Sequence, residues 1–202
     1  MAEPEHYRLF VAVEIPDGVK DGIHEVQEEL RRVVRSPQVR WTRREQFHLT
    51  LRFLGNVESA RLTELQRDLA AACRGVGALQ LWVEGLGFFP DARRPRVAWL
   101  GLSDSRDLLR QLQRRVQWAT AGFAAGLAEA PFTAHVTLAR LNGVSRGEAG
   151  ALGEVAARLA RRSLGQWTTD RIQVMRSELS SHGARHSCLE SIPLGEVPPA
   201  AR

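Results

Sequence analysis

A His-x-Thr triplet set among apolar residues occurs twice in this chain, as His48-Leu49-Thr50-Leu51 and as His135-Val136-Thr137-Leu138. Each copy has the composition of a β-strand, in which successive side chains point to opposite faces. The histidine and the threonine of each copy therefore share one face, while the apolar residues point into a core. Histidine titrates near neutral pH, so two imidazoles across one cleft can supply a general base and a general acid.

A single triplet of this kind carries little information, because a histidine on an edge strand or in a hydrogen-bonded core gives the same pattern. The repetition of the triplet favours a catalytic role for the two histidines. Both copies are rich in β-forming residues, and each is followed by a Gly or Asn turn and then by a helical pattern. The two histidines lie 87 positions apart, a period too long for a solenoid, and we interpret it as an internal duplication of a lobe.

The elements that must position the two motifs follow from the apolar periodicity of the rest of the chain. We expect strands over residues 7–15, 39–42, 79–86, 96–102, 171–180 and 186–194, and helices over 17–34, 59–74, 104–123 and 148–162. Residues 88–90, between two of these strands, form either the rim of a cleft or a hydrophobic plug. Strands joined by hairpins, with helices packed on one face, indicate the antiparallel α+β class.

The composition fits one globular domain or two small intimate lobes, since 202 residues with 44% hydrophobic content can bury a substantial core. We interpret residues 1–195 as a single bilobal domain and 196–202 as a disordered tail. The formal charge of +5 favours an anionic partner such as RNA or a phosphate ester. Lys20 is the only lysine among 28 basic residues, so the arginine excess can also reflect genome composition.

The sequence offers no framework for a disulfide or a metal site. Cys73 and Cys188 lack the spacing of zinc ligands, so we expect two reduced thiols, no metal and no cofactor. The N-terminus lacks the order of a signal peptide, and no apolar run approaches the ~18 residues of a membrane span. We therefore expect a cytoplasmic protein with no membrane partner.

With these motifs the chain resembles the 2H phosphoesterases, and within them the bacterial and archaeal RNA 2′,3′-cyclic phosphodiesterases, once called 2′-5′ RNA ligases. The matching segments are residues 7–14, 41, 48–55, 88–90, 135–140, 176–179 and 192–194. Two intact His-x-Thr-x motifs in this order make the resemblance specific. It implies two pseudo-symmetric lobes, each with an antiparallel sheet and outer helices, and two histidines that face each other across the groove between the lobes.

The resemblance also implies a role for each site residue. His48 would be the proton donor and His135 the proton acceptor, with Thr50 and Thr137 hydrogen-bonded to the non-bridging phosphate oxygens. Phosphodiester hydrolysis needs an activated water, a protonated leaving oxygen and donors to the charged oxygens, so these four residues suit the chemistry. The near-identical motifs do not by themselves tell which histidine is the acid.

Two arginines are candidates for substrate binding. Arg140 matches a family arginine that contacts the bound nucleotide, but strict alternation puts it on the face opposite His135 unless the strand twists or ends first. Arg52 shares the face of His48 by alternation, and a solvated arginine at a strand end is an equal alternative. His186 departs from the family pattern, in which relatives often carry an aromatic residue such as tyrosine.

We therefore expect a monomeric, metal-independent hydrolase that opens the 2′,3′-cyclic phosphate of an RNA end or of a cyclic nucleotide and leaves a 2′-phosphomonoester. Two alternatives stay open. The same displacement run backwards, with a ribose hydroxyl in place of water, would make a reversible 2′-5′ RNA ligase. A fold retained only to bind RNA ends would make a non-catalytic module, and the presence of both histidines and both threonines argues against it.

Overall fold

The computed structural model describes residues 5–124, 131–160, 162–180 and 183–195. Its elements are β1 (His6–Glu14), α1 (Asp17–Val33), β2 (Arg40–Trp41), β3 (His48–Glu58), α2 (Leu62–Cys73), β4 (Leu79–Phe89), β5 (Val97–Ser103), α3 (Leu108–Ala119), β6 (His135–Arg140), α4 (Arg146–Leu159), β7 (Ser163–Thr169), β8 (Arg171–Ser180) and β9 (Gly183–Pro193), with short 3-10 helices η1 (Arg44–Gln46) and η2 (Ser59–Arg61). The tail expected to be disordered, 196–202, lies outside the described residues.

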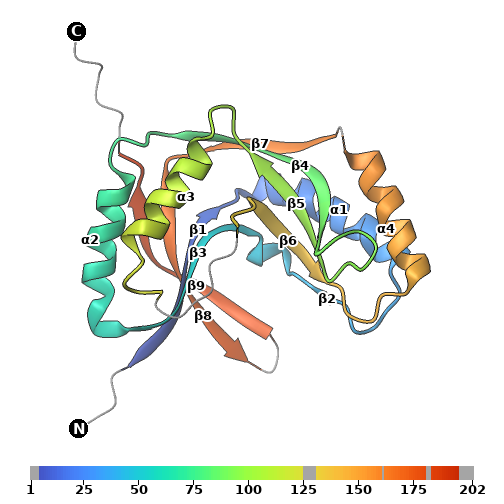
Figure 1. Cartoon of the computed structure of the whole chain (residues 1–202), viewed down its shortest axis with the longest axis horizontal. Coiled ribbons are helices and arrows are strands. Elements are labelled where there is room, and N and C mark those ends of the chain that lie inside the picture. The colour runs from blue at the N-terminus through green and yellow to red at the C-terminus, as the bar shows by residue number, and fades with distance from the viewer. Residues whose placement is uncertain (1–4, 125–130, 161, 181–182, 196–202) are drawn as a thin grey trace.

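Two antiparallel sheets form the body of the molecule (Figure 1). One has the strand order β3-β1-β8-β9 and the other the order β2-β6-β5-β4-β7. Helices α2 and α3 pack together and against the first sheet, while α1 and α4 pack together and against the second. This arrangement confirms the predicted α+β class with two lobes. No helix in the described part of the chain is both long and apolar enough to cross a lipid bilayer.

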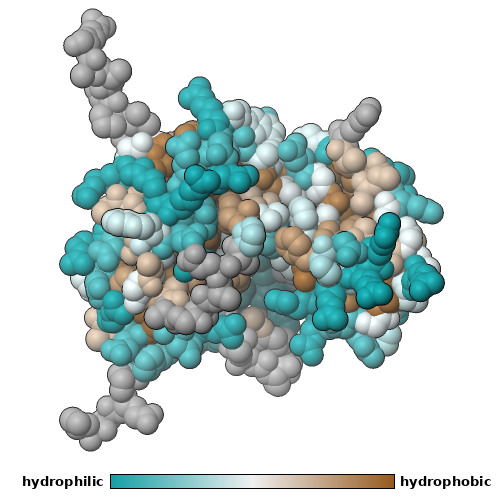
Figure 2. All heavy atoms as spheres, in the orientation of Figure 1, coloured by the Kyte–Doolittle hydropathy of each residue, from teal (hydrophilic) through white to brown (hydrophobic). Residues whose placement is uncertain are grey.

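The two motif strands lie where the sheets meet. β3 is an edge strand of the first sheet, and β6 is separated from the edge of the second sheet only by the two-residue β2. Strands β3 and β6 contact each other, and the surface is hollowed between the two halves of the molecule (Figure 2). The topology therefore brings together two segments that lie far apart in the sequence.

Burial follows the apolar pattern of both motifs. Leu49 and Leu51 of β3 are at most 3% exposed, and Val136 and Leu138 of β6 are completely buried. The helices bury the predicted apolar stripes, which include Ile23, Val26, Leu30, Leu65, Leu69, Leu109, Leu112 and Val116. Burying a leucine side chain completely stabilises the folded state by roughly 1.5–3 kcal/mol. The apolar residues therefore anchor each motif strand in the core, while its histidine and threonine face the hollow.

A buried glutamine ties α1 to the second motif. Gln27 is 1% exposed, and its side-chain amide donates to the main-chain carbonyls of Thr42 and Leu138, at 2.7 and 2.8 Å. The main-chain N–H of Thr42 donates to the same Leu138 carbonyl at 2.9 Å. Because buried polar groups are stable only when they are hydrogen-bonded, this cluster fixes β6 at the residue that follows Thr137.

Candidate active site

His48 begins β3, directly after the η1 turn. Its Nδ1 lies 2.6 Å from the carbonyl oxygen of Gln46, and its Nε2 lies 3.0 Å from the hydroxyl oxygen of Thr50. A carbonyl oxygen can only accept, so Nδ1 carries the hydrogen and donates it. In the neutral ring Nε2 is then the acceptor of the Thr50 hydroxyl. His48 and Thr50 thus share one face, as the alternation predicts.

His135 begins β6 with the same arrangement. Its Nδ1 lies 2.7 Å from the carbonyl oxygen of Thr133, again the residue two positions earlier. The same argument puts the hydrogen on Nδ1 and leaves Nε2 for another partner. Thr137 follows two residues later and is partly buried, like His135 itself. The two motifs therefore present equivalent nitrogen atoms from equivalent strand positions.

Aromatic rings surround both histidines. The centroid of the Phe10 ring lies 4.9 Å from that of His48, and the Phe89 ring lies edge-on to His135 at 5.2 Å. Trp99 packs on Phe89 at 5.0 Å. Residues 88–90 were open to two interpretations, and the structure supports both, since Phe88 is buried in the core and Phe89 lines the site.

The third histidine in this region is His186 of β9. Its ring lies edge-on to Phe10 at 5.0 Å and edge-on to His48 at 5.4 Å. His186 therefore packs as an aromatic residue would at this point. Burial lowers the pKa of His186, and its Nδ1 is buried with no hydrogen-bond partner among the described residues. The ring is consequently favoured in its neutral form beside His48.

Burial lowers the pKa of His48 from 6.5 to about 4. The hydrogen bond to the Gln46 carbonyl opposes this shift, because it stabilises the protonated ring. Repulsion from Lys20, and from His186 and His135 in their protonated forms, lowers the pKa of His48 further. Strands β3 and β6, which carry the two motif histidines, contact each other. Without a bound anion, His48 is neutral at pH 7.

Each motif strand has a β-bulge directly after its threonine. In β3, Thr50 pairs with Ala12 and Arg52 with Val11, so Leu51 has no partner of its own on β1. In β6, Thr137 pairs with Trp99 and Ala139 with Ala98, so Leu138 is the additional residue. A bulge inserts one residue and shifts the alternation of the side chains beyond it. In both strands, the residues after the bulge therefore point to the face opposite to the one that strict alternation predicts.

The bulge in β6 resolves the position of Arg140. Leu138 and Ala139 are both buried, and Arg140, the last residue of the strand, is exposed. Counting through the bulge, Arg140 returns to the face that carries His135 and Thr137. Strict alternation alone would put it on the opposite face, so the bulge supplies the change of direction that nucleotide contact requires.

The bulge in β3 has the opposite effect on Arg52. We expected Arg52 to share the face of His48, and this expectation is wrong, because Arg52 pairs with Val11, a residue of the core. Phe53 takes the cleft position instead, since it pairs with Phe10 and its ring lies 5.9 Å from the Phe10 ring. The side chain of Phe53 is 59% exposed. The counterpart of Arg140 in the first motif is thus an aromatic residue that the sequence did not single out.

Among the described residues, no group of three or more His, Cys, Asp or Glu side chains is arranged to hold a metal ion. Cys73 and Cys188 are both free thiols, as predicted. Burial raises the pKa of Cys73 to about 11, which keeps this thiol protonated and unreactive.

Sequence comparison identifies related proteins. The family model described as "LigT like Phosphoesterase" matches the chain twice, over residues 13–99 and 100–186. An RNA 2′,3′-cyclic phosphodiesterase of Methanothermobacter thermautotrophicus is 27% identical over 186 residues, which are 91% of this chain and 96% of the relative. A protein of the same name from Thermotoga maritima is 31% identical over 135 residues, 66% of this chain and 70% of the relative.

Solved structures share the fold. The crystal structure of a Thermus thermophilus protein superposes on this chain with a TM-score of 0.74 at 24% sequence identity. The superposition covers 94% of this chain and 98% of the Thermus thermophilus chain. E. coli LigT in complex with 3′-AMP superposes with a TM-score of 0.72 at 23% identity, covering 94% of this chain and 99% of its own. The overall fold is therefore shared with these proteins.

Proposed function

The chain belongs to the LigT-like phosphoesterase family, and we propose that it hydrolyses RNA 2′,3′-cyclic phosphate ends with His48 and His135 as an acid–base pair. One observation carries this proposal. In both motifs the imidazole Nδ1 is held by the carbonyl two residues earlier, which directs Nε2 to substrate. In the first motif Nε2 would exchange its bond with the Thr50 hydroxyl for the substrate, which frees that hydroxyl for the phosphate. The names of the curated relatives, RNA 2′,3′-cyclic phosphodiesterase, supply the substrate class.

The two rings would move the two protons of the reaction. Water attacks the phosphorus atom while Nε2 of His135 accepts a proton from it. The bond from phosphorus to the ribose O3′ breaks while Nε2 of His48 donates a proton to that oxygen. The products are a 2′-phosphomonoester and a free 3′-hydroxyl. Thr50 and Thr137 would donate their hydroxyl hydrogens to the non-bridging oxygens, where negative charge accumulates.

The bound phosphate would also prepare His48 for the acid role. Burial lowers the pKa of His48 to about 4 when no ligand is present. A phosphodiester anion next to the ring favours the protonated form and raises the pKa again, because opposite charges within ~4–6 Å stabilise each other. Arg140 at the end of β6 would contact the terminal nucleotide from the same face. E. coli LigT, which shares this fold, forms a complex with 3′-AMP.

We expect the purified protein to open 2′,3′-cyclic nucleotides and cyclic-phosphate oligonucleotides in the presence of EDTA, since the two imidazoles suffice for proton transfer. Phosphorus NMR or chromatography against standards identifies the product isomer, which should be the 2′-phosphate. Activity that disappears in EDTA and returns with Mg²⁺, Mn²⁺ or Zn²⁺ would contradict the mechanism. A 3′-phosphate product would show that the other oxygen leaves.

Replacing the threonines should have a smaller effect than replacing the histidines. Thr50→Ala and Thr137→Ala are each expected to lower kcat/KM about 10-fold to 100-fold, because one neutral donor is lost while others remain. Thr168→Ala, at an exposed position of β7, is the matched control and should leave the kinetics unchanged. A lower melting temperature with unchanged kinetics in the Thr50 and Thr137 variants would mean that these hydroxyls only stabilise the strands.

A further inference from the structure

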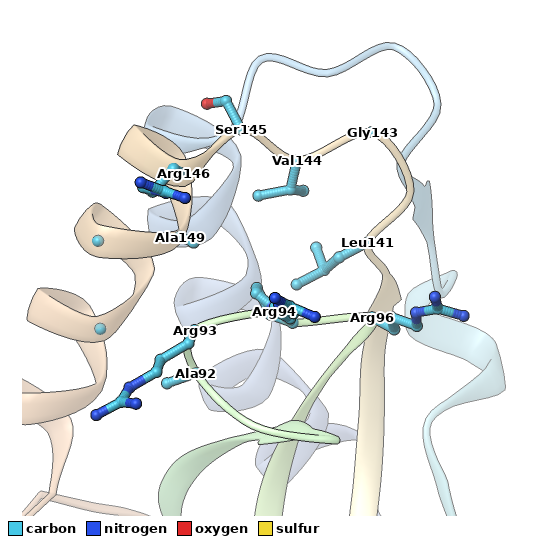
Figure 3. Close-up of a pocket in the computed structure, with 13 residues that line it drawn as sticks. Ala92, Arg93, Arg94, Arg96, Leu141, Gly143, Val144, Ser145, Arg146 and Ala149 are labelled. Carbon is cyan, nitrogen blue, oxygen red and sulfur yellow. The ribbon is translucent and has the colours of Figure 1, made fainter.

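A pocket of about 850 Å³ lies outside the catalytic site, between the β4–β5 loop and the first half of α4 (Figure 3). The loop contributes Arg93, Arg94 and Arg96, and the segment from β6 into α4 contributes Leu141, Ser145 and Arg146. We call this feature the arginine pocket. Neither motif histidine lines it. In Figure 3, Arg93 extends from the loop on the side of α4, Arg94 lies over the loop below Leu141, Arg146 projects from the first turn of the helix, and Arg96 points away from α4.

The arginines of this pocket have no acidic partner among the residues that the structure describes. Elsewhere, arginines form ion pairs, such as Arg44 with Asp17 and Arg61 with Glu64. Within the described part of the chain, the guanidinium groups of Arg93, Arg94, Arg96 and Arg146 form no hydrogen bond or ion pair. Residues 91–96 and 140–153 together contain five arginines and two carboxylates. Figure 2 shows hydrophilic side chains gathered over this part of the surface.

The two carboxylates near the pocket, Asp91 and Glu148, accept hydrogen bonds from main-chain N–H groups. The Asp91 side chain accepts from the main-chain N–H groups of Arg93 and Arg94, at 2.7 and 3.1 Å. Glu148 accepts from the main-chain N–H groups of Arg35 and Ser145, at 2.6 and 2.8 Å, and these bonds lower its pKa to about 2. The two acids therefore shape the loop and cap α4, and the positive charge of the pocket remains available to a ligand.

The pocket is open to a bulky, extended ligand. Gly150 and Gly153 of α4 line it, and a Cβ atom added at either would meet no other atom within 4 Å. These two glycines thus leave a short strip of α4 without side chains beside the arginines. A ligand backbone can lie close to such a strip while the guanidinium groups contact its charged atoms.

The arginine pocket lies beyond the far end of the strand that carries His135. β6 begins at His135 and ends at Arg140, five residues further, which spans about 17 Å at about 3.4 Å per residue. The next main-chain N–H, that of Leu141, donates to the carbonyl of Arg96 at 2.8 Å. On the other side, Phe89 contacts His135 with its ring, and the arginine-rich loop begins two residues later. Strand β6 and the end of β4 therefore connect the site of His135 to the arginine-rich loop.

We propose that the arginine pocket binds the sugar-phosphate backbone of the RNA strand whose cyclic phosphate lies between His48 and His135. The direction of the strand rests on the proposed function, which puts the 3′ end at the histidines. At about 3.4 Å per stacked nucleotide, 17 Å corresponds to about five nucleotides. Arginine suits this ligand because its planar guanidinium group forms bidentate hydrogen bonds with phosphate oxygens. The pocket would read charge and spacing and would not read base sequence.

The test compares an Arg94→Ala/Arg146→Ala variant with wild-type protein. The probes are labelled RNAs of two and eight nucleotides with a 3′-terminal nucleotide that carries a 2′-phosphate, and binding is measured by fluorescence anisotropy. Wild-type protein should bind the longer RNA at least about tenfold more tightly, and the double variant should lose this difference. The slope of log Kd against log salt should fall by about 1.4, at about 0.7 for each lost phosphate contact.

Two further variants make the result specific. Arg106→Ala/Arg114→Ala removes two exposed arginines from the α3 side of the molecule, which covers the other sheet, and should leave the length dependence intact. Arg94→Lys/Arg146→Lys keeps the two charges, so it should keep the salt slope and recover only part of the affinity for the longer RNA, because lysine cannot form the bidentate hydrogen bonds. Thermal unfolding of each variant shows whether the fold is retained.

Three outcomes would overturn the proposal. The pocket variant could keep the length dependence, which would point to another anionic partner such as an acidic protein surface. The α3 control could lose as much affinity as the pocket variant, which would mean that net charge alone matters. The salt slope could stay the same. Turnover of 2′,3′-cyclic AMP is measured in parallel, so if it is absent the proposed function fails while the anisotropy still decides the pocket.

Discussion

His48→Ala and His135→Ala are each expected to lower kcat for a 2′,3′-cyclic nucleotide about 100-fold or more, because general acid–base catalysis contributes about 10²–10⁴-fold. Each substitution removes one of two proton-transfer groups and leaves the aromatic neighbours and the main-chain hydrogen bonds of the strand. Both histidines are only partly buried, so the fold should survive. Steady-state kinetics give the loss, and thermal unfolding shows that the variants are folded.

The double variant and a third histidine provide the controls. If the two imidazoles act in one concerted step, the double variant should lose little more than either single variant, since residues that act as a unit are not additive. His6→Ala, at the exposed start of β1, should keep wild-type turnover. Near wild-type activity in either single variant would end the acid–base interpretation.

The faces of the motif strands could be predicted from the sequence because they depend on local alternation. Leu49, Val136 and Leu138 are fully buried while the histidines are not, as a period of two requires. The hydrogen bonds from Nδ1 to the carbonyls of Gln46 and Thr133 are also local, at a separation of two residues. The chemistry of each half of the site is therefore encoded within a few residues.

The bulges after the threonines could not be predicted in the same way. A bulge is defined by the register against a neighbouring strand, which is β1 for Leu51 and β5 for Leu138. The two bulges move Arg52 and Arg140 in opposite directions relative to simple alternation. The same reason explains Phe53, whose cleft position depends on its pairing with Phe10.

The other features that the sequence did not predict depend on contacts between segments that are far apart in the chain. His186 reaches His48 only because β9 pairs with β8, β8 with β1, and β1 with β3. Strand β7 was not predicted, because its residues, with Gly165 and Gln166 in the middle, lack the apolar run or clean alternation of a buried strand. It forms at the sheet edge against β4. The arginine pocket likewise joins a loop near residue 94 to a helix near residue 146.

The family resemblance and the electrostatics of the free protein favour different roles for His48. The family resemblance makes His48 the acid, yet burial lowers its pKa to about 4 and keeps it neutral at pH 7 in the free protein. A neutral ring is a base. The acid role therefore requires the bound phosphate to raise the pKa of His48, because an opposite charge beside the ring stabilises its protonated form.

The pH profiles should show this change. Values of kcat/KM report ionisations of the free enzyme, and kcat reports those of the substrate complex. An ionisation near pH 4 in kcat/KM should move to higher pH in kcat, and it should be absent from both profiles of a His48→Gln variant that retains measurable turnover. The two rings influence each other, so the observed values belong to the pair.

A substrate with a good leaving group assigns the roles. In a nucleoside p-nitrophenyl phosphodiester the phenolate leaves without a proton, so the general acid is no longer needed while the attacking water still requires a base. We expect His48→Ala to recover most of its roughly 100-fold loss on this substrate and His135→Ala to recover little. Recovery in the His135 variant alone would reverse the roles and fit the low pKa of His48, which would then act as the base. Recovery in neither variant would mean that at least one imidazole contributes by binding the phosphate and not by proton transfer.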